Sequence, residues 1–378
     1  MIESPGILTT LLAFVLVLGP LVFVHELGHY LVGRWCGVKA EEFSIGFGRE
    51  IVGWTDRLGT RWKIAMLPLG GYVRFAGDMN AASQPSPEWL ALPAEERART
   101  FQVKPVWQRA LIVAAGPVTN FLLAIAIIAS FAALHGVDRT PALVEAVQPS
   151  SVAAKAGIRA GDRITAIDGR TMPTFIDLYN YILPRPDTRV EIDLDRGGNT
   201  FRVPVKLGAR LLRDASGKQI RLGLLGIPLP KHRVYERVRV WDAPSEGVRQ
   251  AASIVRATVD GLGLIISGRR SVEELGGPLK IAQVSGQALA LGWPELIGFI
   301  AFMSINLGFI NLLPVPVLDG GHLLFYAIEG IRRRPMEPQV QEWAFRGGLA
   351  ALLALMLLVT FNDLGSFGVW KNLAGLIG

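Results

Sequence analysis

The chain has 378 residues, enough for two or three domains; half of the residues are hydrophobic and 19% are charged. The single cysteine, Cys36, excludes an internal disulfide framework, and the net charge of +7 comes without any helix-turn-helix, zinc-finger or aromatic-basic pattern that would indicate a nucleic-acid partner. A mean hydropathy of +0.35 favours a membrane protein, and the positions of the apolar residues decide this point.

Four apolar stretches have the length of membrane spans. They run from Ile7 to Gly33, from Ala110 to Leu134, from Leu296 to about Leu313 and from Gly347 to Phe361, and with their flanks they predict membrane segments at 1–35, 106–135, 294–330 and 343–362. A helix needs about 20 mostly apolar residues to cross a bilayer. The first stretch lacks the basic start and the small-residue cleavage site of a signal peptide, so we interpret it as a retained helix.

Positively charged residues predict how these spans are oriented. No Lys or Arg precedes the first span, whereas several lie between Arg34 and Arg109, and Arg332–Arg334 lie between the third and fourth spans. Loops rich in Lys and Arg stay in the cytoplasm. We therefore expect both basic segments to be cytoplasmic, and both termini and the long segment between the second and third spans to be outside.

Residues 36–105, after the first span, predict a small β-element on the cytoplasmic side. "FSIGFG" and "TRWKIAMLPLGGYVRF" have the pattern of short strands, and Gly70-Gly71 indicates either a turn or a place where the backbone packs closely. From this pattern alone, an ordinary surface hairpin is the favoured interpretation. The polar stretch from Asp78 to Arg99 predicts a mobile loop.

Residues 140–230 predict a compact α+β domain. The pattern indicates short helices at 153–156 and 175–183, and strands at 164–169, in "RVEIDLDR", in "TFRVPVKL" and at 221–229. The stretch "AAKAGIRAGDRITAIDG" resembles a PDZ domain of the bacterial type, present in one copy. Such a domain binds an extended peptide or a C-terminus by adding it to a sheet edge. The alternative is a small β-rich domain that binds nothing.

Residues 240–290 predict an amphipathic helix and a linker. In "SEGVRQAASIVRATVDGLGLI", one helical stripe carries Val248, Ala252, Val255, Val259 and Leu262. We expect this helix either to lie on the membrane surface or to pack against the rest of the protein.

The first span contains "HELGH", with His25, Glu26 and His29 inside an apolar run. Histidines four residues apart share one helix face and can bind a single cation, and neutral imidazoles suit zinc. Each ionisable group costs about 2.5–3.5 kcal/mol at the bilayer centre, so three of them within five residues require a partner, which a metal supplies. The alternative is a histidine pair satisfied by hydrogen bonds within a helix bundle.

A third metal ligand is expected in "SINLGFINLLPVPVLDGGHLLF", where Asp319 is the only acidic residue. Pro314 and Pro316 end the helix, so the backbone near Asp319 is expected to be irregular. Irregular backbone at membrane depth is tolerated where it is buried in protein or lines a wet cavity. The predicted orientation brings Asp319 and the two histidines to the cytoplasmic ends of their spans. Taken alone, Asp319 would be interpreted as a turn or a helix cap.

Together these segments resemble the site-2 protease family of intramembrane zinc metalloproteases, in its bacterial RseP-like branch. The shared motifs cover nearly the whole chain in the order of the family: "FVHELGH", "PLGGYVRFAGD", "AAGPVTNF", the single PDZ domain, "GGPLKIAQ" and "NLLPVPVLDGGH". The resemblance implies a polytopic α-helical membrane protein with four transmembrane helices, a membrane-associated β-element and one extracytoplasmic PDZ domain. Enterobacterial members carry two tandem PDZ domains, so a two-domain filter for substrate size is not carried over to this chain.

The resemblance also implies the roles of particular residues. His25, His29 and Asp319 are the implied Zn²⁺ ligands, and Glu26 is the implied general base. Asn306 and Asn311 are implied to hold the substrate or to stabilise the transition state. The region of Gly70, Gly71 and Tyr72 is implied to present the substrate as an extended strand, in contact with membrane lipid.

The implied activity is zinc-dependent endoproteolysis in the bacterial inner membrane. Substrates would be the transmembrane segments of single-span proteins, of the anti-sigma-factor type or remnant signal peptides, in regulated intramembrane proteolysis. Two other classes are considered. A catalytically idle PDZ scaffold that binds exposed C-termini has no need of Glu26 with two histidines and Asp319. A metal transporter would need several polar residues along a path through the spans, and the sequence shows one cluster at one depth.

Overall fold

The computed structural model describes residues 6–77, 93–213, 219–272, 276–334 and 336–366. The chain forms two compact units. Unit 1 consists of Met1–Ile128, Gly247–Thr258 and Arg270–Leu364, and unit 2 consists of Ala129–Glu246, Val259–Arg269 and Gly365–Gly378. Most of the stretch from Asp78 to Arg99, for which a mobile loop is predicted, lies outside the described residues; its last part forms the short helix α2 (Ala94–Arg97).

Four helices in the described part of the chain are long and apolar enough to cross a membrane. They are α1 (Ile7–Trp35), α3 (Val106–His135), α8 (Trp293–Asn311) and α10 (Pro338–Ser366). Large apolar side chains such as Leu11, Leu122 and Leu357 stay exposed on their surfaces, as expected for helices whose solvent is lipid. The prediction of four helices able to span a membrane is confirmed.

Helices α1 and α3 approach each other closely at the HELGH segment. A side chain on Gly28 would lie 2.5 Å from Thr119 Oγ1 and 2.6 Å from the carbonyl oxygen of Ala115. Thr119 Oγ1 donates a hydrogen bond across the interface to the carbonyl oxygen of Val24, at 3.0 Å. In lipid, small residues of this kind allow helix backbones to pack against each other. The glycine between the two histidines therefore fixes how near α3 comes to them.

Helices α6 (Ala243–Ile266) and α7 (Pro278–Leu291) occupy most of the predicted 240–290 segment. The unit 1 part of α6 packs against α3 and α8 through Ala251, Ile254 and Val255. Of the predicted stripe, Val255 lies on this face, whereas Val248 is half exposed. Gly247 is close to α3 as well, since a side chain there would lie 2.7 Å from the carbonyl oxygen of Ile125.

The predicted break after the third span is present. Helix α8 ends at Asn311, and α9 (Asp319–Arg332) starts at the predicted ligand after an irregular stretch that contains both prolines. Val317 in this stretch has a φ of +89°, which is strained for a β-branched residue. A side chain on Gly320 would overlap the carbonyl oxygens of this stretch. The two glycines after Asp319 thus allow the irregular backbone to fold back onto the start of α9.

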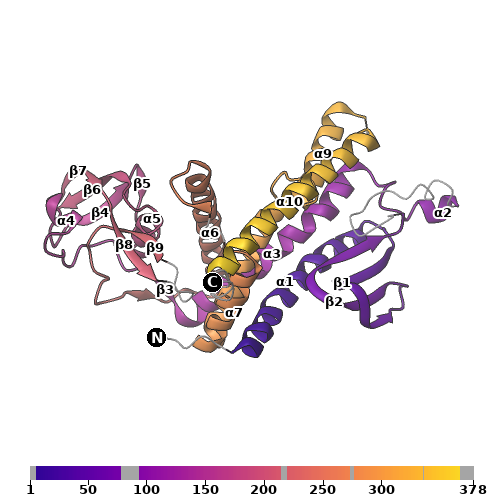
Figure 1. Ribbon diagram of the computed structural model, residues 1–378, viewed down its shortest axis with the longest axis horizontal. Coiled ribbons are helices and arrows are strands. Elements are labelled where there is room, and N and C mark those ends of the chain that lie inside the picture. The colour runs from indigo at the N-terminus through magenta and orange to yellow at the C-terminus, as the bar shows by residue number, and fades with distance from the viewer. Residues whose placement is uncertain (1–5, 78–92, 214–218, 273–275, 335, 367–378) are drawn as a thin grey trace, which may run out of the picture. The chain divides into compact units, whose positions relative to one another are not determined.

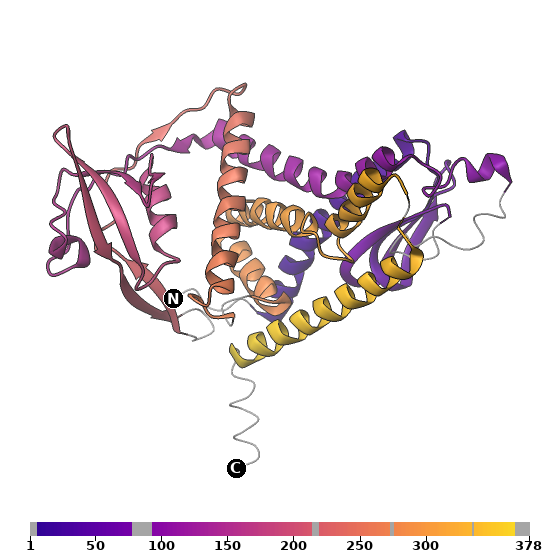
Figure 2. The same ribbon diagram turned by 90° about the horizontal axis from the view of Figure 1, so that it is seen from above.

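The β-element is a long hairpin of β1 (Ala40–Thr55) and β2 (Arg61–Phe75), which lies beside α1 in both views (Figures 1 and 2). The chain reverses at 56–60, where the Asp56 carboxylate accepts hydrogen bonds from two backbone N–H groups. Gly70-Gly71 is therefore not the turn of the hairpin; both glycines lie within β2. Phe43 of β1 pairs with both Trp62 and Val73 of β2, so the strands bend. Gly70, between these two residues of β2, has a φ of +138°.

The hairpin leaves many large apolar side chains exposed. They include Ile51, Val52, Trp54, Leu58 and Met66. So much exposed apolar surface on a small element indicates contact with an apolar partner or a membrane.

Unit 2 contains a four-stranded sheet with the order β5-β4-β6-β7. Its elements are α4 (Val152–Lys155), β4 (Arg163–Ile167), β5 (Arg170–Thr171), α5 (Phe175–Ile182), β6 (Arg189–Arg196) and β7 (Asn199–Lys206), close to the predicted positions. Alternating residues of these strands, including Ile164, Ile192 and Leu194, form the core with Leu178 of α5.

The ends of this domain differ from the prediction. The strand predicted at 221–229 is β9 (Gln219–Leu224), which pairs with β8 (Gly208–Arg213), a strand that was not predicted. Strand β9 ends at Leu224, which pairs with Gly208, the first residue of β8. The remaining strands, β3 (Val137–Asp138) and β10 (Tyr235–Glu236), pair with each other.

In unit 2 an ion pair joins the buried Asp162 carboxylate to Arg196, whose side chain is 36% exposed. The Asp162 carboxylate accepts hydrogen bonds from Arg196 Nε at 2.6 Å, from Arg196 Nη2 at 2.8 Å and from the backbone N–H of Arg159 at 2.8 Å. The bonds from Arg196 hold the pKa of Asp162 below its ordinary value. A carboxyl whose pKa is lowered by folding stabilises the fold above its unfolded pKa of about 3.9, and this contribution is lost as the pH falls through the folded-state pKa.

Asp162→Asn is therefore expected to destabilise unit 2 at pH 7. Below about pH 4 the stability of the variant and that of the wild type should become more similar. Amides of β4 and β6 should exchange with deuterium about tenfold faster or more, since charge-assisted hydrogen bonds to a buried group are lost. Hydrogen exchange of the full chain, followed by mass spectrometry, measures this. The control is Asp193→Asn, because Asp193 pairs with an Arg202 side chain that is 65% exposed. Equal protection in the two variants would contradict the expectation.

Candidate active site

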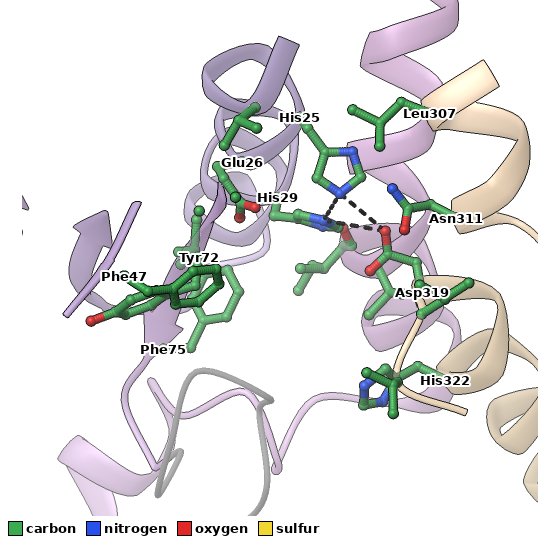
Figure 3. Close-up of a pocket in the computed structure, with 18 of the residues that line it drawn as sticks. His25, Glu26, His29, Phe47, Tyr72, Phe75, Leu307, Asn311, Asp319 and His322 are labelled. Atoms are coloured by element: carbon green, nitrogen blue, oxygen red, sulfur yellow. Dashed lines mark hydrogen bonds and ion pairs between the residues drawn. The ribbon is translucent and has the colours of Figure 1, made fainter. Parts of the chain in front are cut away.

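A cavity of about 430 Å³ in unit 1 lies between α1, α3, the hairpin and the start of α9 (Figure 3). Of the predicted site residues, those that line it are His25, Glu26, His29, Gly70, Gly71, Tyr72, Asn311 and Asp319. The fold thus gathers residues from both ends of the sequence around one cavity.

His25, His29 and Asp319 point toward one another in this cavity (Figure 3). The Nε2 atoms of the two histidines are 3.3 Å apart, and Asp319 Oδ2 lies 3.2 Å from that of His25 and 3.6 Å from that of His29. The helical spacing of the histidines explains how one face of α1 presents both rings. Asp319 reaches them because it is the first residue of α9.

This set of atoms fits a zinc ion. Asp319 Oδ2 is buried and makes no hydrogen bond among the described residues, although it faces two imidazole nitrogens. Three atoms that each carry a lone pair would be unfavourable together in an apolar environment, and a divalent cation between them satisfies all three. Two imidazoles and one carboxylate also match the ligand set of catalytic zinc sites, which keep a fourth position open.

The partner of His29 fixes which of its nitrogens is free for a metal. Its Nδ1 lies 2.9 Å from the backbone carbonyl oxygen of Ile112 in α3. A carbonyl can only accept a hydrogen bond, so Nδ1 carries the proton and Nε2 presents its lone pair to the cavity. The tautomer of His29 is thus assigned from its partner.

Glu26 is buried at the edge of the cavity, next to the hairpin. A side chain on Gly71 would lie 2.8 Å from Glu26 Cγ and 2.7 Å from the carbonyl oxygen of Ser44. Of the two interpretations of Gly70-Gly71, close backbone packing is therefore the one that the structure supports. The absence of a side chain at Gly71 leaves room for the Glu26 carboxylate beside β2.

Two more predicted residues lie in the cavity. Asn311 is beside Asp319 (Figure 3), and Tyr72 lines the hairpin side, where its hydroxyl donates a hydrogen bond to Glu42 at 2.9 Å. His322 also lines the cavity and packs against Phe345. Both the amide of Asn311 and the edge of β2 are thus accessible from the space next to the histidines.

Asn306 is the one predicted site residue that does not line the cavity. Its Oδ1 accepts a hydrogen bond from Thr258 of α6 at 2.9 Å, and its Nδ2 donates to the carbonyl oxygen of Phe302 at 2.8 Å. In this arrangement the amide joins α8 to α6. A role for Asn306 in substrate binding stays a prediction.

Sequence reasoning missed three contributions from α3. Ile112, Gly116 and Asn120 are spaced four residues apart and face the two histidines: Ile112 through its carbonyl, Asn120 through its amide, and Gly116 by leaving space for both rings. Asn120 is a polar amide within an apolar span, and an argument like the one that singled out HELGH could have found it. The carbonyl of Ile112 and the missing side chain of Gly116 leave no such signal.

Comparison with protein families matches residues 13–355 to the family described as Peptidase family M50. The chain belongs to peptidase family M50. The resemblance to the site-2 protease family is thereby confirmed. The matched residues, 13–355, include all residues that line the cavity.

Proteins that match this chain over nearly its whole length are also named as metalloproteases. This M50 peptidase is 43% identical over 371 residues to an Agrobacterium fabrum protein named as a zinc metalloprotease, covering 96% of this chain and 98% of the relative. It is 44% identical over 359 residues to one of Rhizobium meliloti, covering 94% and 96%, and 37% identical over 394 residues to the metalloprotease MmpA of Caulobacter vibrioides, covering 98% and 99%. The chain is a zinc metalloprotease, which disfavours the idle scaffold.

A solved structure also matches part of this M50 peptidase. It is the PDZ domain of an SdrC-like protein from Listeria monocytogenes, with 27% sequence identity, a TM-score of 0.18, and coverage of 21% of this chain and 81% of that chain.

Proposed function

We propose that this zinc metalloprotease is an intramembrane endopeptidase that cleaves the transmembrane segments of single-span proteins. The observation that carries the proposal is the convergence of His25, His29 and Asp319 in a cavity built from helices of membrane-spanning length. Two of these ligands lie inside α1 itself, so the reacting peptide bond has to reach them from within the apolar layer.

The roles of the residues follow from their chemistry. His25, His29 and Asp319 would hold the zinc ion, which supplies Lewis-acid chemistry when bound. Glu26 takes a proton from the attacking water and delivers it to the leaving nitrogen of the cleaved peptide bond. The Asn311 amide donates a hydrogen bond to the oxygen on which negative charge develops.

The hairpin is suited to present the substrate as an extended strand. Gly71 and Tyr72 line the cavity and pair on one side with Ile45 and Ser44 of β1. Among the described residues Gly71 and Tyr72 each pair with β1 alone, so the opposite side of this part of β2 is an edge to which a peptide can add. The substrate helix has to unwind before cleavage because a peptide bond within a helix is shielded from attack. The exposed apolar side chains of the hairpin support contact with membrane lipid.

The remaining parts of the proposal concern orientation and partners. The basic residues near the spans support cytoplasmic loops after the first and third spans, with the termini and residues 140–230 outside a bacterial inner membrane. The "AAKAGIRAGDRITAIDG" motif and the sheet with its flanking α5 support a PDZ domain that takes an extended peptide or C-terminus. Substrates of the anti-sigma-factor type or remnant signal peptides, in regulated intramembrane proteolysis, fit this arrangement.

The test is cleavage in proteoliposomes that hold the full chain and a single-span substrate. We expect cleavage within the apolar segment, its loss with 1,10-phenanthroline and its recovery with Zn²⁺. His29→Ala should bind less zinc and lose cleavage, while His232→Ala, an exposed histidine of unit 2, should behave as wild type. Fragments that map only outside the apolar segment would refute intramembrane cleavage, and activity that survives the chelator would refute the zinc mechanism.

A further inference from the structure

The two histidine ligands have different partners on α3. Asn120 is fully buried, and its side-chain amide lies against His25. Its Nδ2 is 3.1 Å from His25 Nδ1, while its Oδ1 is buried and makes no hydrogen bond among the described residues. The contact is thus close, but it leaves the acceptor of the amide unused.

The arrangement of His29 shows what His25 needs. His29 directs Nε2 at the metal position because its Nδ1 donates to the carbonyl oxygen of Ile112, two turns before Asn120 on the same face of α3. His25 also directs Nε2 at the metal position, toward Asp319 Oδ2. An imidazole whose Nε2 binds a metal carries its proton on Nδ1, so His25 likewise requires an acceptor at Nδ1.

The two ends of an asparagine amide have nearly the same shape, and their order is assigned from hydrogen bonding. An amide nitrogen opposite a protonated Nδ1 would set one donor against another. Rotating the Asn120 amide by half a turn puts Oδ1 at this contact, and the buried acceptor then gains a donor. The pairing of His25 becomes equivalent to that of His29.

We propose that Asn120 is the positioning residue of the zinc ligand His25, accepting the Nδ1–H of that histidine through its amide oxygen. The amide fixes the tautomer and the ring orientation of His25 before the metal arrives. Two features suit Asn120 to this role. It is closed from water, and its own backbone is fixed because the Ser304 hydroxyl of α8 donates to its carbonyl oxygen at 2.8 Å. The inference rests on the zinc site proposed above.

The experiment compares zinc affinity in the purified full chain, by competition with a chelator of known affinity. Asn120→Leu, which keeps the size but removes the acceptor, is expected to weaken zinc binding about 10–100-fold. Asn120→Asp keeps an acceptor and should stay within a few-fold of wild type. Ser285→Ala removes a buried hydroxyl of α7 that donates to Ile281 of its own helix and does not line the cavity, so it should also stay close to wild type.

A second measurement separates positioning from loss of the fold. The d–d absorption bands of bound Co²⁺ report the ligand geometry, and we expect them to change in Asn120→Leu and to be retained in Asn120→Asp. Wild-type zinc affinity in Asn120→Leu, or equal losses in the Leu and Asp variants, would overturn the proposal. His29→Ala serves as the reference: if it keeps zinc, the zinc site itself is wrong, which is a different result from an indifferent Asn120.

Discussion

Replacing Glu26 with glutamine should reduce peptide-bond cleavage by about 10²–10⁴-fold while leaving the bound zinc in place. The amide has almost the same shape as the carboxylate, but it cannot take a proton from water. Glu26 lies outside the three converging ligand atoms, so the metal has no reason to leave. Turnover in proteoliposomes and zinc content per chain measure the two halves of this prediction.

The matched control is Glu295→Gln, at an exposed position in the first turn of α8. It makes the same chemical change away from the cavity and should leave turnover unaltered. A Glu26→Gln protein that works at more than about a tenth of the wild-type rate would exclude Glu26 as the general base. Loss of zinc in that variant would instead make Glu26 part of the metal site.

Gly116→Ala should remove zinc binding and activity together, although it adds only one methyl group. The new carbon would overlap His29 Nε2 and lie 2.5 Å from His29 Cε1 and 2.9 Å from His25 Cε1. Either the rings turn away from the metal position or α3 retreats from α1, and a displacement of about 1 Å at a reacting centre can cost about 100-fold in rate. Zinc content and turnover of the purified variant test this.

Helix propensity acts in the opposite direction, since alanine is favoured over glycine within a helix by about 1 kcal/mol. Gly298→Ala in α8 is the matched control, because no atom lies within 4 Å of its added carbon. We expect that variant to keep zinc and activity. Normal zinc content in Gly116→Ala would mean that α3 does not approach the histidines as closely as the structure has it.

The proposed metal ligands were predictable from the sequence because lipid makes their residue types energetically costly. His25, Glu26 and His29 stand out in an apolar helix, and helical spacing puts both imidazoles on one face. Asp319 stood out as the only acid near a pair of prolines, and the distribution of Lys and Arg suggested a similar depth. These arguments need only one span at a time, which is why they work without coordinates.

Two of the contributions of α3 to the site could not be predicted in this way. The carbonyl of Ile112 is a backbone group that every residue has, and the role of Gly116 is an absence. Both depend on how closely two helices approach, which is a property of a pair of helices and not of either sequence.

The hairpin was predicted in kind but not in detail. The double glycine at 70–71 was a stronger turn signal than the segment at 56–60, where Asp56 in fact closes the turn with its side chain. Gly71 is instead glycine because β2 passes against Glu26 and Ser44. A local pattern cannot tell a glycine needed for its own backbone from one needed by a neighbour.

That Asp319 begins a helix of its own has a consequence for biosynthesis. The two histidines are made near the start of the chain, and the third ligand is made only when α9 emerges, after the hairpin, unit 2 and the end of α8. A nascent or truncated chain that stops before Asp319 holds the complete HELGH helix and still lacks one side of the metal site. With the roles proposed above, such a chain would have the general base but no complete zinc site, so cleavage would begin only after the C-terminal part has joined the membrane.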